Sequence, residues 1–206
     1  MLQTENLTYQ YKNAQILRFP DLSVEAGQTL LICGDSGTGK TTLLHLLSGL
    51  RQPTGGQLKI AGHSAHKLSP SKMDQFRGKN IGIVYQQSHF IQALSLRSNL
   101  LASPYTKAPE KLEEVAQRLG IRHLLNRLPH ELSVGEQQRA SIARAVMNTP
   151  KLLLADEPTS ALDNRNCSEV LGLLQQEAAV NNTALLIVTH DLRLMKEVKT
   201  RIKLTS

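Results

Sequence analysis

At residues 34–41 the chain reads GDSGTGKT, that is Gly34, Asp35, Ser36, Gly37, Thr38, Gly39, Lys40 and Thr41. This spacing is G-x-x-x-x-G-K-[ST], in which glycines let the backbone fold tightly so that consecutive N–H groups point at phosphate oxygens. The stretch follows a short apolar run, Thr29–Cys33, and opens an expected helix over Lys40–Leu50. That helix adds the positive end of its dipole. A strand, a glycine loop and a helix in this order indicate a nucleotide-binding α/β unit.

The side chains at the end of this loop have distinct expected roles. We expect Lys40 to reach the β- and γ-phosphates of a nucleotide and the Thr41 hydroxyl to ligate Mg²⁺. Thr42 follows directly and is expected to contact the nucleotide as well. The alternative is a glycine turn with an incidental Gly-Lys-Thr. The buried strand before the loop and the helix after it disfavour that alternative, so ATP and Mg²⁺ are the expected ligands.

A second candidate site follows another apolar run, Lys151–Ala155, which ends in Asp156 and Glu157. A strand here would bring Asp156 to the carboxyl edge of the sheet, where open α/β sheets bind ligands. Asp156 is suited to hold Mg²⁺ through water, because Mg²⁺ retains much of its hydration. Glu157 is the candidate general base that orients and polarises the attacking water. A solvated strand end is the alternative, and the phosphate loop makes it the weaker one.

Alternation of strand and helix patterns predicts the fold class. The expected strands, besides those above, are Leu2–Tyr9, Gln15–Val24, Gln57–Ile60, Ile81–Tyr85 and Thr183–Val188, and the expected helices are Pro109–Leu119, Glu136–Asn148, Asn164–Val180 and Asp191–Val198. This order predicts an α/β P-loop NTPase with a mainly parallel central sheet, helices on both faces and an N-terminal antiparallel β portion. We expect one domain over 1–206, with 1–86 and 149–206 forming the core and about 87–148 an inserted helical subdomain.

Composition narrows the function classes. The chain has 206 residues, 40% hydrophobic and 20% charged, as in ordinary folded proteins. Its net charge is +7, but the basic residues are scattered, aromatics make up 3% and Trp is absent, so no nucleic-acid partner is expected. Cys33 and Cys167 form neither a zinc pattern nor a disulfide framework. The N-terminus carries no leader pattern, and the apolar runs fall short of the ~20 residues that span a bilayer. A cytoplasmic location is expected.

Five further features resemble the ATP-binding cassette family in type and order. Leu132-Ser133-Val134-Gly135-Glu136 is similar to the signature LSGGQ, Ser160-Ala161-Leu162-Asp163 to the D-loop, His190 to the switch histidine, Gln86 to the Q-loop glutamine, and Tyr11 to the aromatic residue that stacks on adenine. Together with the phosphate loop and Asp156-Glu157, the resemblance covers nearly the whole chain.

The resemblance implies a site shared between two chains. Ser133 and Gly135 would begin a helix and offer a second anion site, which in this family serves the γ-phosphate bound to the opposite subunit. A head-to-tail dimer with two ATP molecules follows, either a homodimer or a pseudo-dimer with a related ATPase subunit. His190 would donate a hydrogen bond to the γ-phosphate. Gln86 would reach the metal or water and relay its state to the helical insertion. Glu157, His190, Lys40 and Gln86 are thus the expected catalytic residues.

Three positions need separate comment beside the family pattern. Tyr9 lies two residues before Tyr11, and we expect it to face the opposite side of the strand. Val134 stands where the family has glycine, and it adds bulk and restricts the backbone. Glu136 stands where glutamine is usual, and it adds a negative charge that the helix dipole opposes. We expect these two departures to weaken or slow the closure of the dimer.

The family implies a subunit that powers a transporter from the cytosolic face of the inner or plasma membrane, bound to a separate membrane-spanning permease. The apolar stretch 88–94 is either the groove that receives this partner or ordinary packing. Met73–Gln87, with an expected lack of extension after Ser206, resembles the lipoprotein-release and macrolide-export group. Two alternatives stay open. One is an ATPase that signals to a membrane partner without transport, and the weaker one is a soluble cassette ATPase of DNA repair or translation.

Overall fold

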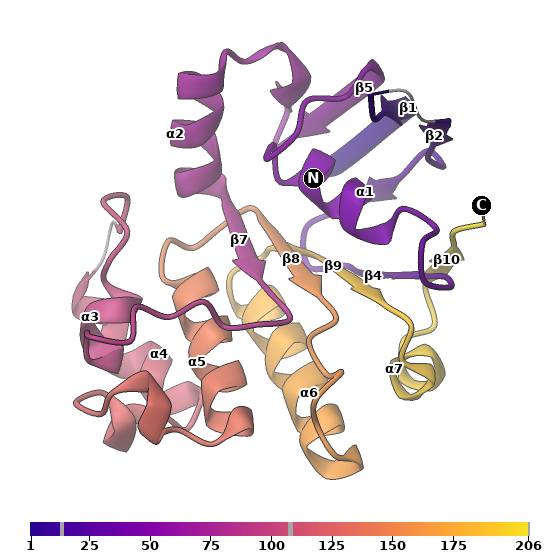
Figure 1. Ribbon diagram of the computed structural model, residues 1–206. Coiled ribbons are helices and arrows are strands. Elements are labelled where there is room, and N and C mark those ends of the chain that lie inside the picture. Colours follow the sequence, from indigo (N-terminus) through magenta and orange to yellow (C-terminus); the bar gives the residue numbers. More distant parts are fainter. Residues whose placement is uncertain (13–14, 107–108, 206) are drawn as a thin grey trace.

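Two sheets organise the chain in the computed structural model, which describes residues 1–12, 15–106 and 109–205 (Figure 1). The central sheet has five parallel strands in the order β10-β4-β9-β8-β7. These strands are β4 (Thr29–Cys33), β7 (Ile81–Val84), β8 (Leu152–Asp156), β9 (Ala184–Thr189) and β10 (Arg201–Lys203). Because the strands are parallel, their carboxyl ends meet at one edge of the sheet.

The second sheet is antiparallel and built from the N-terminal strands. It has the order β2-β1-β5-β6, and β3 also pairs with β1. Its strands are β1 (Leu2–Gln10), β2 (Ile16–Arg18), β3 (Ser23–Val24), β5 (Gly55–Ile60) and β6 (His63–Ser64). The two sheets match the predicted combination of a parallel sheet with an N-terminal antiparallel portion.

Helices cover both faces of the central sheet (Figure 1). Helix α1 (Lys40–Leu47) lies on the face that is turned toward the antiparallel sheet, and α5 (Val134–Val146) and α6 (Asn164–Val180) cover the other face. The remaining helices are α2 (Pro70–Asn80), α3 (Leu96–Leu100), α4 (Leu112–Arg118) and α7 (Leu192–Glu197), with short 3-10 turns at Ala65–Lys67, Pro109–Lys111, Arg122–Leu124 and Pro129–Glu131. None of the described helices has the length and apolarity that a bilayer crossing requires.

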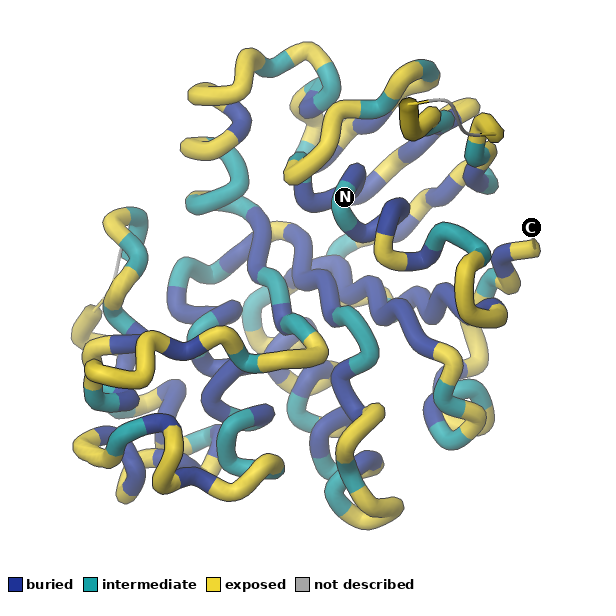
Figure 2. The backbone as a smooth tube through the Cα atoms, viewed as in Figure 1, coloured by how far each residue is buried: buried dark blue, intermediate teal, exposed yellow. Residues whose placement is uncertain are grey.

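The strands β4, β8 and β9 of the central sheet are buried on both faces, as their continuous apolar runs predict (Figure 2). Neighbouring residues alternate between two cores. Leu152 and Leu154 face α1 and the antiparallel sheet, whereas Leu153 and Ala155 face the helices on the other side. This second core also contains residues of α3 and α4, so the helical region shares its apolar interior with the sheet.

A buried ion pair joins the helical region to α6. Arg118 on α4 donates to both carboxylate oxygens of Glu177 on α6, at 2.8 and 3.0 Å, and Glu177 is 1% exposed. Glu114 takes a further donor of the same guanidinium at 2.6 Å. A two-pronged contact of this kind restricts both distance and orientation. It fixes α4 against α6.

Several elements differ from the sequence-based expectation. The predicted strand Gln15–Val24 is two short strands, β2 and β3, and α3 and β6 were not predicted. Helix α2 was not expected, because PSKMDQFRGKN lacks an apolar stripe. Pro70 occupies its first turn, where the missing N–H is tolerated, and Met73 is its buried residue. Met73 packs against Gly49, which has φ +68° and ends α1 as expected. Strand β10 was not expected either, since its basic residues Arg201 and Lys203 are exposed at the sheet edge.

Candidate active site

Four strand ends bring the expected motifs to one edge of the central sheet. The phosphate loop follows β4, His190 follows β9, Glu157 follows β8, and Gln86 follows β7 by two residues. Together they border an open cavity of about 720 Å³, lined by Asp35, Ser36, Gly37, Gly39, Lys40, Thr41, Thr42, Gln86, Asp156, Glu157, His190 and Leu192. Leu192 was not expected. Motifs that lie more than a hundred residues apart in sequence thus face one space.

The phosphate loop has the conformation that its glycines permit. Gly37 and Gly39 have φ of 86° and 90°, which L-residues with a side chain rarely adopt. Gly34 and Thr38 do not line the cavity; the Thr38 hydroxyl donates to the Asp35 carbonyl at 2.9 Å. The loop lines the cavity and leads directly into α1, the arrangement that suits phosphate binding at a helix N-terminus.

Lys40 is a buried cation suited to an anion. It is 8% exposed, and its Nζ donates to the carbonyls of Gly34 and Asp35, both at 2.8 Å. Among the described residues it pairs with no carboxylate. A buried ammonium bonded to carbonyls alone is incompletely compensated. The cavity that it borders therefore favours a negatively charged ligand.

Asp156 meets the requirements of a cation ligand. It ends β8 inside the cavity. Burial raises the pKa of its carboxyl, the nearby charge of Glu157 raises it further, and Lys40 opposes both. Two adjacent carboxylates in a partly buried place are stabilised by a cation. No group of three or more His, Cys, Asp or Glu side chains gathers as a metal cage in the described residues. Asp156 and Thr41 therefore fit a Mg²⁺ site with few protein ligands. Water and phosphate oxygens would fill the remaining coordination positions.

Glu157 is held in place by the last residue of β9 and by the residue that follows it. Its backbone has φ 47°, an uncommon value for a residue with a side chain. Its carboxylate accepts from the Thr189 hydroxyl at 2.9 Å and from the His190 N–H at 3.1 Å. His190 Nδ1 lies 2.6 Å from Glu157 Oε1, and the His190 side chain is 67% exposed toward the cavity. Thr189 was missed by sequence reasoning, although a polar residue ending an apolar strand was a usable signal.

Gln86 lies on the wall between two cavities. Its amide donates to the Ser160 hydroxyl at 3.2 Å. Behind it lies a smaller cavity of about 200 Å³, lined by Gln86, Gln87, Ser88, Val134, Gln137, Gln138, Glu157, Pro158, Ser160, Ala161 and Leu162. The predicted Q-loop and D-loop are therefore in direct contact. Glu157 and Gln86 border both spaces.

Tyr11, the predicted adenine-stacking residue, lies beside the phosphate loop but is not among the residues that line the cavity. Its hydroxyl lies 2.9 Å from Thr42 Oγ1, beside the phosphate loop, and the Arg51 guanidinium lies 5.1 Å from its ring centroid. The expectation that Tyr9 faces the opposite side is wrong. The two rings meet edge to face with centroids 4.8 Å apart. Tyr11 directly follows β1, and alternate residues of an extended chain point to the same side.

The signature residues lie outside the nucleotide cavity. Ser133 caps α5, which begins at Val134, two residues before its expected start. Glu136 Oε2 accepts from the Ser133 N–H at 2.8 Å and from its hydroxyl at 2.7 Å. These hydrogen bonds hold the pKa of the Glu136 carboxyl below its usual range. Gly135 follows in the first turn, and neither Ser133 nor Gly135 lines the cavity.

Comparison with known proteins identifies the family. The model of the ABC transporter family matches residues 17–160. The chain belongs to the ATP-binding cassette family. It is 37% identical, over 92% of its length and 84% of the relative's, to the lipoprotein-releasing system ATP-binding protein LolD of Shewanella denitrificans.

Solved structures of related cassettes agree with this assignment. The dimeric structure of MJ0796, a bacterial ABC transporter cassette, superposes with a TM-score of 0.87 at 28% identity, covering 99% of this chain and 94% of that one. A dimeric post-hydrolysis state of MJ0796 with ADP and Pi gives 0.85 at 29% identity, over 100% and 94%. CbiO1 of Clostridium perfringens, part of the transporter complex cbiONQ, gives 0.83 at 28%, over 93% and 78%. The predicted fold class is confirmed, and this cassette binds and hydrolyses ATP.

Proposed function

We propose that this cassette ATPase powers a membrane transporter through nucleotide-driven closure of a dimer. Its partner is a separate membrane-spanning permease, which holds it at the cytosolic face of the inner or plasma membrane. The proposed unit is one nucleotide-binding domain over 1–206, in which about 87–148 is the helical subdomain that carries the signature. LolD belongs by name to a lipoprotein-releasing system, and CbiO1 to a transporter complex.

One observation carries the proposal of a dimer. The cavity contains the phosphate loop, Asp156, Glu157 and His190, whereas Ser133 and Gly135 begin α5 at a different place on the surface. The start of α5 presents backbone N–H groups and a hydroxyl, which together suit a phosphate. Both MJ0796 structures are dimeric. A second copy would supply these groups to the first copy's nucleotide, so two composite sites form together.

Within each site the residues have separate proposed tasks. Lys40 and the loop N–H groups bind the β- and γ-phosphates, and Tyr11 offers its ring to adenine. Glu157 accepts a proton from the attacking water, and its contacts with Thr189 and His190 hold its carboxylate in one orientation. His190 donates to the γ-phosphate through the nitrogen that does not face Glu157. Thr41, Asp156 and Gln86 would hold Mg²⁺, which neutralises charge on the phosphate oxygens.

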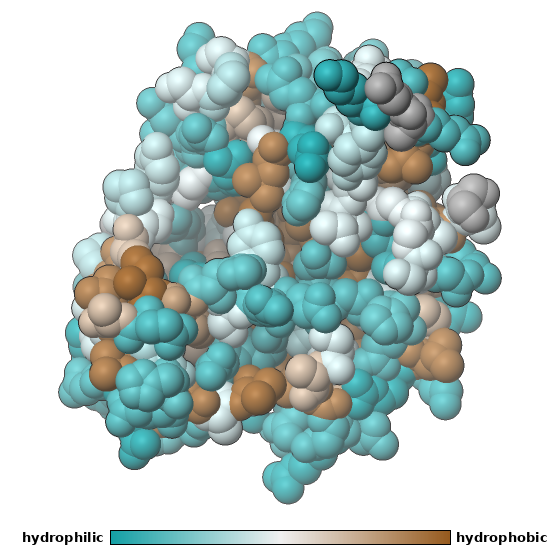
Figure 3. Space-filling view, in the orientation of Figure 1, coloured by the Kyte–Doolittle hydropathy of each residue, from teal (hydrophilic) through white to brown (hydrophobic). Residues whose placement is uncertain are grey.

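The segment 88–94 offers a surface for the permease. Phe90 is buried, with the Arg144 guanidinium of α5 4.7 Å from its ring centroid. Arg144 also donates to the carbonyls of Ser88 and His89, at 2.5 and 3.1 Å. Ile91 and Leu94 remain 53% and 37% exposed. Figure 3 shows hydrophobic side chains gathered on the side of the molecule where α3 lies in Figure 1. The segment can therefore serve both expected uses, because Phe90 packs against the protein while Ile91 and Leu94 stay exposed for docking.

Purification from detergent-solubilised membranes tests the proposed partner. The tagged chain should carry an integral membrane protein in stoichiometric amount, and its Ile91→Glu variant should lose it while ATP binding is unchanged. A chain that retains no membrane protein at low salt would contradict the proposal. Vesicles containing the complex then separate transport from signalling. ATP-dependent release of a lipoprotein supports transport, whereas ATP hydrolysis without any release supports the regulatory alternative.

A further inference from the structure

Arg193, in the first turn of α7, uses every donor of its guanidinium on the segment next to the active site. Its Nε donates to Asp191 Oδ1 at 2.9 Å, and one terminal nitrogen donates to Asp191 Oδ2 at 2.7 Å and to the Thr159 carbonyl at 3.1 Å. The other terminal nitrogen donates to the Leu162 carbonyl at 2.9 Å and to Asn164 Oδ1 at 3.2 Å. Two of the five donors thus hold Asp191, and the other three reach the segment 159–164, so the planar fork connects α7 with that segment.

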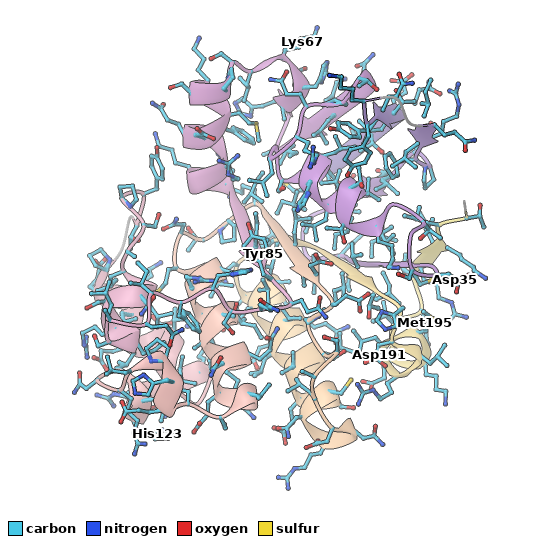
Figure 4. All side chains as sticks on the ribbon, viewed as in Figure 1. Asp35, Lys67, Tyr85, His123, Asp191 and Met195 are labelled. Carbon is cyan, nitrogen blue, oxygen red and sulfur yellow. The ribbon has the colours of Figure 1, made fainter. Side chains whose placement is uncertain are left out.

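Asp191, the partner of Arg193, lies between α6 and α7 (Figure 4). Its carboxylate also accepts from the Thr159 hydroxyl at 2.8 Å. Its backbone N–H donates to the Thr189 hydroxyl at 2.9 Å, and that hydroxyl donates to Glu157 Oε2 at 2.9 Å. An unbroken path of hydrogen bonds thus leads from Arg193 to the carboxylate of Glu157. The same path ties Glu157 to the segment that contains Ser160.

Capping of α7 does not explain this arrangement. Asp191 already accepts the Arg193 backbone N–H at 2.9 Å, as an N-cap residue does. That contact needs the Asp191 carboxylate but not the Arg193 side chain. The guanidinium instead donates to backbone carbonyls of Thr159 and Leu162, which belong to the loop between β8 and α6. Its geometry therefore fixes the separation between two loops.

We propose that Arg193 is a positioning residue for ATP hydrolysis, which holds the loop 159–164 and the loop 189–191 as one unit and thereby fixes Glu157 and His190. The inference rests on the proposed roles of Glu157 and His190. Reactions in oriented sites lose about a hundredfold in rate when a group moves by ~1 Å. Loss of the fork should therefore lower kcat without removing the phosphate loop that binds ATP.

Two substitutions separate positioning from stability. Arg193→Ala removes the fork and the ion pair. Arg193→Lys keeps a cation beside Asp191, but its compact ammonium cannot match the planar fork on both loops. We expect kcat for ATP to fall at least tenfold in both variants, while the KM for ATP and the calorimetric affinity for MgATP stay within about threefold. Arg122→Ala is the matched control, because within the described part of the chain the guanidinium of Arg122 has one ion pair, to Glu113 at 3.0 Å, on the exposed surface of the helical region. It should keep the wild-type kcat.

The kcat and the ATP affinity of all variants are measured well below their melting temperatures, so that every protein is folded in the assay. A folded Arg193→Lys protein with wild-type kcat would overturn the inference, because an ion pair alone would then suffice. A parallel loss of ATP affinity and kcat would also overturn it, since that pattern indicates general destabilisation. Glu157→Gln is measured alongside. Wild-type turnover in that variant would contradict the proposed catalytic role itself, and so identifies a failure of the proposed function rather than of the Arg193 inference.

Discussion

Replacement of Glu136 by glutamine should speed ATP hydrolysis. The Glu136 carboxylate engages the Ser133 hydroxyl at 2.7 Å and the Ser133 N–H at 2.8 Å. In the proposed dimer this same hydroxyl must turn to the γ-phosphate of the opposite copy. The carboxylate therefore competes for the hydroxyl and also adds a negative charge near the phosphate. A glutamine oxygen can still accept the N–H that caps α5, but it binds the hydroxyl less tightly.

The size of the effect follows from the two kinds of hydrogen bond. A bond to a charged group contributes about 1.5–3 kcal/mol and a neutral one about 0.5–1.5 kcal/mol. Glu136 is partly exposed, so solvent screening keeps the difference near ~1 kcal/mol. Since 1.36 kcal/mol is a tenfold change in rate, closure and turnover should rise about fivefold. The substitution should also destabilise the start of α5 by about 0.3–1 kcal/mol, because it removes a negative charge that interacts favourably with the positive end of the helix dipole.

Steady-state phosphate release at saturating MgATP measures the predicted rise. Glu131→Gln is the matched control, because Glu131 caps the preceding 3-10 turn by accepting the Leu128 N–H at 2.6 Å, whereas the hydrogen bonds of the Ser133 N–H and hydroxyl go to Glu136. The control should keep the wild-type rate. A fall in turnover in Glu136→Gln, or an equal rise in both variants, would refute the competition between Glu136 and phosphate.

Three further predictions concern the binding site and the frame around it. Lys40→Ala should lose calorimetrically detectable nucleotide binding, because the buried cation of the phosphate loop is removed; unchanged affinity would contradict its assigned role. Hydrogen bonds from Arg193 lower the pKa of Asp191 from 3.8 to about 2. The ionised carboxylate therefore adds up to about 2 kcal/mol to the free energy of unfolding above pH ~4, and this contribution is lost as the pH falls toward ~2. Urea unfolding should show Asp191→Asn less stable at neutral pH and nearer to wild type at pH ~2, and a gap independent of pH would count against this. Glu177→Ala should lower the free energy of unfolding by about 1–3 kcal/mol, since it leaves the guanidinium of Arg118 with the exposed Glu114 as its remaining ion-pair partner among the described residues. Glu113→Ala, at an exposed site, should cost less; equal losses would disprove the burial argument.

The parts of the fold that can be predicted from the sequence are those determined by residues close together along the chain. The phosphate loop is recognisable because glycines at fixed spacing permit one backbone path, and Lys151–Ala155 because continuous apolar residues indicate a doubly buried strand. Helix α6 has the predicted bounds Asn164–Val180, since apolar residues recur on one face and Asp163 caps its start. Helix α2 lacked such a face and was missed.

The parts of the site that sequence does not predict depend on contacts between distant segments. Thr189 and Arg193 act on Glu157 through hydrogen bonds to residues about thirty positions away. No spacing rule marks them, because the contact exists only after β8 and β9 are paired. The capping box formed by Ser133 and Glu136 at the start of α5, by contrast, can be predicted from the sequence. Both residues lie in one turn, and the serine with an acid three residues later is a known start signal for a helix.

The most direct test of the shared active site uses Glu157→Gln, which should bind MgATP without turning it over. Size-exclusion chromatography with light scattering, run with and without MgATP, measures the mass. The composite site of Lys40 from one copy and Ser133 from the other predicts a monomer without nucleotide and a stable two-chain species with it. An exclusively monomeric variant at saturating MgATP would contradict the account, because one chain would then have to provide the whole site.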